Sequence, residues 1–343
     1  MFDELGFYLL AGAAESPAEL VDELRTAEDL GLGAAFLSER WNVKEAATIC
    51  GAAAVASRRI AITTAATNYN IRHPLVTASF AATMHALSSG RFTLGIGRGP
   101  KALFDKFGLP CATTAQMEDF ALLMRRLWKG EVVVGHDGPA GTYPALALDP
   151  RMSFDIPLGL VAFGPQSLSL AGRAFDTVVL HTFFTDETTA RCVQTVRDAA
   201  ERAGRDPQSV KVWSCFATVG DHIPEEVRIR KTVGRLATYL QGYGPLMVRT
   251  NNWDRDALQR FYDTPLVRDF PGLIDAAATI DQLQQVAELI PSDWLAPAAT
   301  GSPDQCAAAV TAQFELGVDG VIMHGATPGE LQPIVSAYAA RGR

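Results

Sequence analysis

Two stretches far apart in the chain, AEDLGLGAAFL (Ala27–Leu37) and QFELGVDGVIM (Gln313–Met323), match almost position for position. Each holds the end of an amphipathic helix, a turn that contains glycine, and then a short apolar run. A strand that is apolar on both faces is typical of a parallel strand covered by helices. The two stretches therefore predict helix–turn–strand units of an α/β protein.

The same unit recurs in LSSGRFTLGIG (Leu87–Gly97) and LAGRAFDTVVLH (Leu170–His181). Extended along the chain, the pattern predicts strands with helical stretches between them, at Leu5–Leu10, Ala34–Leu37, Ile60–Ala66, Phe92–Gly97, Leu158–Phe163, Thr177–His181, Val210–Val219 and Gly320–Met323. Eight β/α repeats are the number found in a (β/α)8 TIM barrel. A doubly wound open sheet is the alternative, and it normally has fewer strands.

No low-complexity linker divides the chain, so we expect one barrel domain over residues 1–343 with two insertions. The stretch near 130–156 is rich in glycine and proline and predicts a loop insertion that could hold a hairpin. The stretch near 224–300 is too long for a simple return from strand to strand, so we expect extra helices there.

Composition excludes several classes of protein. The net charge of −8 disfavours nucleic acid or an anionic membrane as a partner, and 48% hydrophobic residues rule out a disordered chain. No apolar run reaches about 18 residues, and the acidic start of the chain is unlike a signal peptide, so we expect a cytoplasmic protein. The scattered cysteines predict reduced thiols, most of them buried, and the histidine spacing predicts no metal site.

Polar or aromatic residues follow the apolar runs at most of the predicted strand ends: Tyr8, Ser38–Trp41, Thr67–Asn70, Arg98, Phe163–Gly164, His181–Thr182 and His324. Active sites of TIM barrels lie at the C-terminal ends of the strands, so this set predicts an active site. For any one of these residues, capping its own loop is the alternative.

Two glycine-containing segments are candidates for binding a ligand. Gly95–Gly99 lacks the full G-x-G-x-x-G spacing, so it indicates either close approach of backbone to a flat ligand or a simple turn. Gly164-Pro165 starts a predicted helix, and a helix N-terminus is a natural phosphate site, although plain helix initiation explains it equally well.

Four segments in order resemble the luciferase-like monooxygenase superfamily, whose barrels use reduced FMN or coenzyme F420: Ala27–Arg40, Ile62–Gly99, Leu160–His181 and Ala299–Met323. The form T-N-x-x-x-R-H-P at Thr67–Pro74 is most similar to F420-dependent members such as methylene-tetrahydromethanopterin reductase. The resemblance implies a non-proline cis peptide at Ala65–Ala66 behind the deazaflavin ring. It also implies cofactor contacts from Glu39, Thr67, Asn68, Gly97 and the phosphate-binding turn Gly164-Pro165.

The chain departs from the glucose-6-phosphate dehydrogenase branch of this superfamily, since Arg40 replaces a histidine and Pro100 replaces a glutamate. We therefore expect no sugar-phosphate substrate. Arg40 could pair with an anionic substrate or the F420 side chain, or with a surface acid, and Trp41 and His324 are further expected substrate contacts. For catalysis we expect Glu39 and His181, the latter as proton donor, with substrate binding or loop capping as its alternative.

These features together favour an F420-dependent oxidoreductase that transfers a hydride between F420 and an unidentified small organic substrate. The alternatives are an FMN-dependent monooxygenase and a non-catalytic flavin- or F420-binding protein. We also expect a homodimer, in which the helix over Ile71–Leu87 packs against a second copy through Ala78, Ala81 and Ala82.

Overall fold

The computed structural model describes the whole chain except residues 13, 15, 41–42, 100 and 343. Within the described residues, eight parallel strands close into a barrel, because β8 pairs with β9 and β11 pairs with both β9 and β1. In chain order they are β1 (Phe2–Tyr8), β2 (Leu32–Leu37), β3 (Ala61–Thr64), β4 (Phe92–Ile96), β7 (Leu158–Val161), β8 (Thr177–Val179), β9 (Lys211–Gly220) and β11 (Gly320–His324). The predicted (β/α)8 TIM barrel is confirmed.

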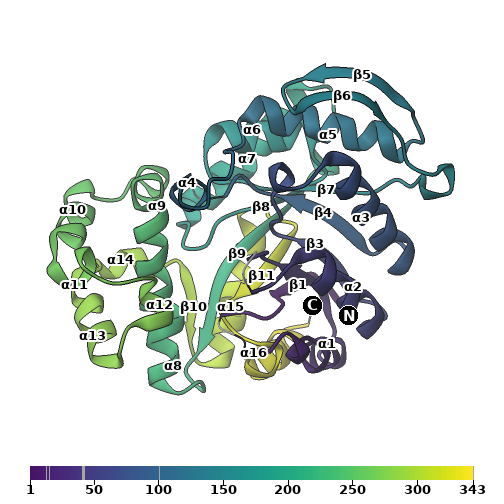
Figure 1. Ribbon diagram of the computed structural model, residues 1–343. Coiled ribbons are helices and arrows are strands. Elements are labelled where there is room, and N and C mark those ends of the chain that lie inside the picture. The colour runs from purple at the N-terminus through teal and green to yellow at the C-terminus, as the bar shows by residue number, and fades with distance from the viewer. Residues whose placement is uncertain (13, 15, 41–42, 100, 343) are drawn as a thin grey trace.

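Helices surround the barrel on the outside (Figure 1). They are α1 (Leu20–Asp29), α2 (Ala46–Ala56), α3 (Pro74–Leu87), α5 (Thr114–Trp128), α6 (Pro165–Ala174), α7 (Asp186–Arg202), α15 (Pro303–Glu315) and α16 (Pro328–Ala340), with the short α4 (Lys101–Lys106) before α5. The strands are buried on both faces, as all six residues of β2 illustrate. This is why their sequences are continuous apolar runs.

The glycines in the two matching stretches have the same structural role. Gly31 has φ +79° and Gly317 has φ +91°, in the left-handed region that glycine enters without steric cost. The N–H of Gly31 donates to the carbonyl of Glu28 at 3.1 Å, and that of Gly317 donates to Phe314 at 3.0 Å. Each glycine therefore ends a helix and starts the turn into the next strand.

Several strands are shorter than predicted. β3 ends at Thr64, β7 at Val161 and β8 at Val179, so the predicted strand ends at Ala66, Phe163 and His181 were wrong. The reason is that burial continues beyond the sheet, since Ala162 and Leu180 are only 0% and 2% exposed. An apolar run marks what is buried, and it does not mark where the ladder of hydrogen bonds stops.

Residues 224–300 hold helices that gather on one side of the barrel (Figure 1). They are α8 (Glu225–Ile229), the π-helical η5 (Arg230–Gly234), α9 (Arg235–Asn251), α10 (Arg255–Asp263), α11 (Pro265–Arg268), α12 (Ile274–Ala277), α13 (Ile280–Leu289) and α14 (Ser292–Leu295). They share a core of their own, in which the rings of Trp253 and Trp294 stack 4.7 Å apart. Phe163 and Phe183 of the barrel pack against this core, so α9 lies over the C-terminal ends of the strands.

Two further pieces of sheet complete the chain. β5 (Val133–Gly138) and β6 (Gly141–Leu146) form an antiparallel hairpin inside the stretch expected to be a loop insertion. β10 (Ala298–Gly301) pairs in parallel with the end of β9, and it lies where only helices were expected. Its sequence, AATG, is short and has no large apolar residue, so the hydrophobic pattern does not mark it.

The helix expected to meet a second copy of the chain is α3. Ala78, Ala81 and Ala82 are each 0% exposed and pack inside this chain, so the expectation that they contact a partner was wrong. Their small size instead lets α3 pack closely within its own domain, where Trp128 Nε1 donates to the carbonyl of Ala78 at 3.1 Å. Over the part of the chain that the structure describes, no helix is long and apolar enough to cross a membrane.

Candidate active site

The predicted site residues fall into two groups at the C-terminal ends of the strands. Glu39 and Thr67 follow β2 and β3, while His181 follows β8 and His324 ends β11, which pairs with β1. Thr67 belongs to the segment of residues 65–68 that directly follows β3.

The Ala65–Ala66 peptide bond is cis, as the family resemblance implies. Hydrogen bonds hold this segment from both neighbouring strands, with Ala65 N–H donating to Leu37 (2.7 Å) and Thr67 N–H donating to Gly95 (3.0 Å). The hydroxyl of Tyr8, on β1, also donates to the carbonyl of Ala65 at 3.3 Å. The backbone of the segment is therefore fixed by β1, β2 and β4 together.

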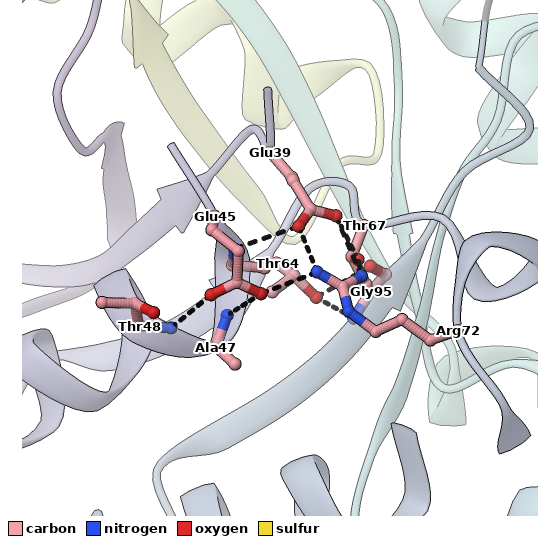
Figure 2. A network of polar contacts seen from close by, with 9 residues as sticks. Glu39, Glu45, Ala47, Thr48, Thr64, Thr67, Arg72 and Gly95 are labelled. Carbon is pink, nitrogen blue, oxygen red and sulfur yellow. Dashed lines mark hydrogen bonds and ion pairs between the residues drawn. The ribbon is translucent and has the colours of Figure 1, made fainter. Parts of the chain in front are cut away.

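Several polar partners hold the carboxylate of Glu39, as Figure 2 shows. Its side chain is 0% exposed and forms an ion pair with Arg72, whose guanidinium contacts both carboxylate oxygens. It also accepts hydrogen bonds from the Thr67 hydroxyl (2.5 Å) and from Ala46 N–H (3.0 Å). Glu39 therefore ties the end of β2 to the segment after β3, and its catalytic role stays a prediction.

Sequence reasoning missed two members of this network, Arg72 and Glu45. Arg72 Nη2 also bonds Glu45 at 2.7 Å (Figure 2). Although partial burial opposes its ionisation, N–H groups of Thr48 and Ala47 and the Arg72 guanidinium hold the pKa of Glu45 at about 2. Arg72 is the arginine of the T-N-x-x-x-R-H-P form, which was the signal available for it.

The glycines of β4 are explained by close packing against β3. A Cβ on Gly95 would lie 1.8 Å from the carbonyl oxygen of Thr64, and one on Gly97 would lie 2.8 Å from Ala66 Cβ. Asn68 Nδ2 donates to the carbonyl of Gly97 at 2.7 Å, which fixes the segment from the other side. Gly95 is required by the backbone of Thr64 and Gly97 by the side chain of Ala66, and this is independent of any dinucleotide fingerprint.

The start of α6 differs from most other helix starts around the barrel. Helices α2, α7 and α16 begin with a side chain that accepts backbone N–H groups, from Glu45, Thr185 and Thr327. α6 begins at Gly164 followed by Pro165, and it has no such side-chain cap. Its first-turn N–H groups are therefore open to an anion, which the positive end of the helix dipole favours.

His181 lies among aromatic rings. Its ring centroid is 4.3 Å from that of Phe163, 4.7 Å from that of Tyr239 and 5.6 Å from that of Tyr243. Burial lowers the pKa of His181 to about 4, so the imidazole is neutral at the pH where it was expected to titrate. Tyr239 and Tyr243 come from α9, and sequence reasoning missed both.

His324 contacts the same α9 tyrosine. Its Nε2 lies 3.2 Å from the hydroxyl of Tyr239, and its ring meets that of Tyr8 edge to face at 5.4 Å. Its Nδ1 is buried and has no hydrogen-bond partner among the described residues. Burial, together with the positive charge of Arg235, lowers the pKa of His324 well below its usual value.

Arg40 is exposed, and its backbone forms an isolated bridge with Lys44. Lys44 Nζ donates to the carbonyl of Leu10 at 2.9 Å, and burial lowers the pKa of Lys44 to about 8. The expected substrate contact Trp41 lies outside the described residues, as does Pro100. Among the residues that are described, no group of three or more potential ligands gathers for a metal ion.

The family model for luciferase-like monooxygenases matches residues 4–320. Two curated relatives are 5,10-methylenetetrahydromethanopterin reductases. The one from Methanopyrus kandleri is 28% identical over 76% of this chain and 80% of its own length, and the one from Methanolobus tindarius is 24% identical over 87% of each. The solved structure of the coenzyme F420-dependent tetrahydromethanopterin reductase from Methanopyrus kandleri superposes with a TM-score of 0.83, 20% identity and 99% coverage of both chains. The chain belongs to the luciferase-like monooxygenase family.

Proposed function

We propose that the protein is an F420-dependent oxidoreductase that transfers a hydride between coenzyme F420 and a small organic substrate. The observation that carries this proposal is the likeness to two methylenetetrahydromethanopterin reductases over most of the chain. The T-N-x-x-x-R-H-P form at Thr67–Pro74 supports the same branch of the family.

The residues at the barrel end fit such a cofactor. The uncapped start of α6 offers backbone N–H groups of the kind that bind a phosphate, with Gly164 and Pro165 as the turn. Ala65, Ala66, Thr67 and Asn68 form a backbone surface fixed on three sides, where a flat ring system could rest. Bound F420 supplies or accepts the hydride, and the protein positions and shields the reacting groups.

In this arrangement Glu39 acts as a positioning residue. Its carboxylate is held by Arg72, Thr67 and the N–H of Ala46, so it fixes the backbone of the segment at 65–68. The exposed Arg40 is a candidate for contact with the anionic side chain of F420.

Titration of the purified protein with F420 and with FMN, followed by fluorescence quenching, tests the proposal. We expect F420 to bind more tightly than FMN. Equal or tighter binding of FMN would move the protein to the flavin-dependent monooxygenases. Binding of F420 without turnover of any substrate would favour a carrier protein instead.

We further infer a homodimer, as expected from the family resemblance. α3 carries two exposed apolar side chains, Val76 (56% exposed) and Leu87 (47%), on the face away from its buried alanines. Sedimentation velocity at micromolar concentration tests this inference, and a monomer alone at that concentration contradicts it. A dimer that persists when Val76 is changed to glutamate would place the interface elsewhere.

A further inference from the structure

A row of uncharged polar groups crosses the barrel end, from the segment after β3 to His324. The Tyr8 hydroxyl donates to the Ala65 carbonyl, and the buried thiol of Cys215 lies near it. The Cys215 Sγ lies 3.0 Å from the hydroxyl of Thr182, and Thr182 in turn lies near the Tyr239 hydroxyl. The set ends at His324.

The last atom of this set is the buried Nδ1 of His324, which has no partner within the described part of the chain. The other buried polar atoms of this kind belong to Asn70, Thr77 and His85, on η2 (Tyr69–Ile71) and α3. His324 alone of the four lies at the end of a barrel strand, beside Tyr239. A buried polar atom without a partner costs about 1–3 kcal/mol, so a group that satisfies it gains affinity.

The charges around His324 favour a neutral imidazole. Burial is the largest cause that lowers its pKa, followed by the positive charges of Arg235, Arg40 and Lys231. Arg235 is paired with Asp275 at 2.8 Å and Lys231 is paired with Glu330 at 2.6 Å, so these two cations are largely compensated. The His181 imidazole faces His324 as well, and it is neutral for the same reason of burial.

Most side chains next to this pair are aromatic and uncharged, and the nearby Arg235 is already paired with Asp275. The rings of Phe163, His181, Tyr239 and Tyr243 lie within 4.3–5.9 Å of one another, measured between the centroids of contacting pairs. A charged substrate group placed against these rings would lose its hydration without gaining an ion pair. The polarity of these side chains therefore matches a neutral, largely apolar molecule with one hydrogen-bond acceptor.

We propose that His324, backed by Tyr239, is the catalytic residue that exchanges the proton of the reaction. The substrate class that fits is an uncharged ketone or aldehyde in the direction of reduction, and the matching alcohol in the direction of oxidation. This inference rests on the proposed function, because it concerns the proton that accompanies hydride transfer.

In the direction of reduction, bound F420 would supply the hydride to the carbonyl carbon. The π electrons of the C=O bond would then form the new O–H bond with a proton from Nδ1 of His324. Nε2 of His324 takes the Tyr239 hydroxyl proton, so the imidazole stays neutral throughout. Burial raises the pKa of Tyr239 to about 12, and the Arg235 guanidinium, 5.7 Å from the centre of its ring, opposes this rise. The phenolate is therefore transient, and solvent returns its proton. A neutral imidazole is an established donor to a developing oxyanion.

Two variants and one control test this inference. His324→Gln removes the imidazole, and Tyr239→Phe removes only the hydroxyl and keeps the ring that packs in the cluster. His85→Gln is the matched control, since His85 also has a buried, unpartnered Nδ1 but lies on α3. The probes are 2-pentanone, which is neutral, and levulinate, which has the same methyl ketone and a carboxylate.

The first measurement is single-turnover oxidation of reduced F420 by each probe. We expect His324→Gln to slow the reaction with 2-pentanone by about 10²–10⁴-fold, the range for a lost general acid, with F420 affinity within about twofold. Tyr239→Phe slows it less and weakens the solvent isotope effect, and His85→Gln leaves the rate unchanged. The second measurement is the ¹⁵N imidazole spectrum, in which 2-pentanone shifts the Nδ1 signal of His324 and leaves that of His85 in place.

Several outcomes overturn the inference. A His324→Gln variant that reacts at an unchanged rate, or a His324 signal that 2-pentanone does not move, removes His324 from the chemistry. Faster reaction with levulinate than with 2-pentanone, or no reaction with either, overturns the substrate class. These results differ from failure of the proposed function, which would appear as absence of F420 binding in the unsubstituted protein.

Discussion

Gly164→Asp should separate the stability of the protein from its affinity for F420. Gly164 has φ −110° and ψ 169°, an extended conformation that any residue adopts. A Cβ at this position would meet only Leu246 Cδ1, at 3.9 Å, so an aspartate fits without displacing its neighbours. Its carboxylate can accept the N–H groups of the first turn of α6, as N-cap aspartates do.

The two expected effects have opposite signs. An aspartate in place of glycine at an N-cap stabilises a helix by a few tenths of a kcal/mol, so the unfolding temperature should stay within about 1 °C or rise. The same carboxylate occupies the N–H groups that the phosphate of F420 would use. Loss of one charge-assisted hydrogen bond, at about 1.5–3 kcal/mol, weakens F420 binding about 10- to 100-fold.

Fluorescence titration with F420 and thermal unfolding without ligand measure these effects on the same preparation. Gly164→Ala is the control for size, because it adds the Cβ and no cap, and it should bind F420 within about threefold of the unsubstituted protein. Gly164→Asn adds a neutral cap and should fall between the two. An aspartate variant that binds F420 as tightly as the original chain would refute phosphate binding at α6.

The remaining predictions concern the network around residue 39 and the packing of the barrel. Arg72→Met leaves the Glu39 carboxylate buried and unpaired, and should cost about 3–5 kcal/mol in urea unfolding, much of which the added Glu39→Gln change restores. Gly95→Ala should prevent folding or lower the free energy of unfolding by more than about 3 kcal/mol, because the new Cβ meets the Thr64 carbonyl. Gly51→Ala in α2 is the control, since a Cβ there has open space and should stabilise the protein slightly. Burial lowers the pKa of His181 to about 4. The stabilisation that the neutral His181 side chain provides is therefore full above about pH 6.5 and is lost as the pH falls towards 4. His181→Gln should flatten this part of the profile of unfolding free energy against pH.

The barrel could be predicted from the sequence because its strands and turns are specified locally. The pattern around Gly31 recurs at Gly317, and both glycines take the positive φ that the helix-to-strand turn requires. The strand ends were less predictable, because Ala162 and Leu180 are buried although they lie outside the ladder. β10 escaped prediction because a four-residue alanine-rich strand takes its pairing from β9 and not from its own side chains.

The candidate site was predictable only in part, for a similar reason. Residues at or just after strand ends, such as His324 and Thr67, could be identified, since the parallel strands bring them to one end of the barrel. Tyr239 and Tyr243 could not, because α9 belongs to an insertion whose position over the barrel depends on tertiary packing. Arg72 was visible in the sequence, but its link to Glu39 joins residues 33 positions apart and has no local signature.

The segment at 65–68 owes its position to contacts of two different kinds. On the side of β2 the contacts are ionic, because Arg72 and Thr67 hold Glu39, whose N–H donates to the carbonyl of Ala66 at 3.1 Å. On the side of β1 the contact is neutral, because the Tyr8 hydroxyl holds the carbonyl of Ala65. The compensated charges thus lie on the β2 side of the segment, and the uncharged groups that lead to His324 lie on the other. This separation fixes the backbone of the segment and keeps the buried Glu39 carboxylate away from Nδ1 of His324, the proposed proton donor. A negative charge beside that atom would oppose the negative charge that develops on a carbonyl oxygen of the substrate.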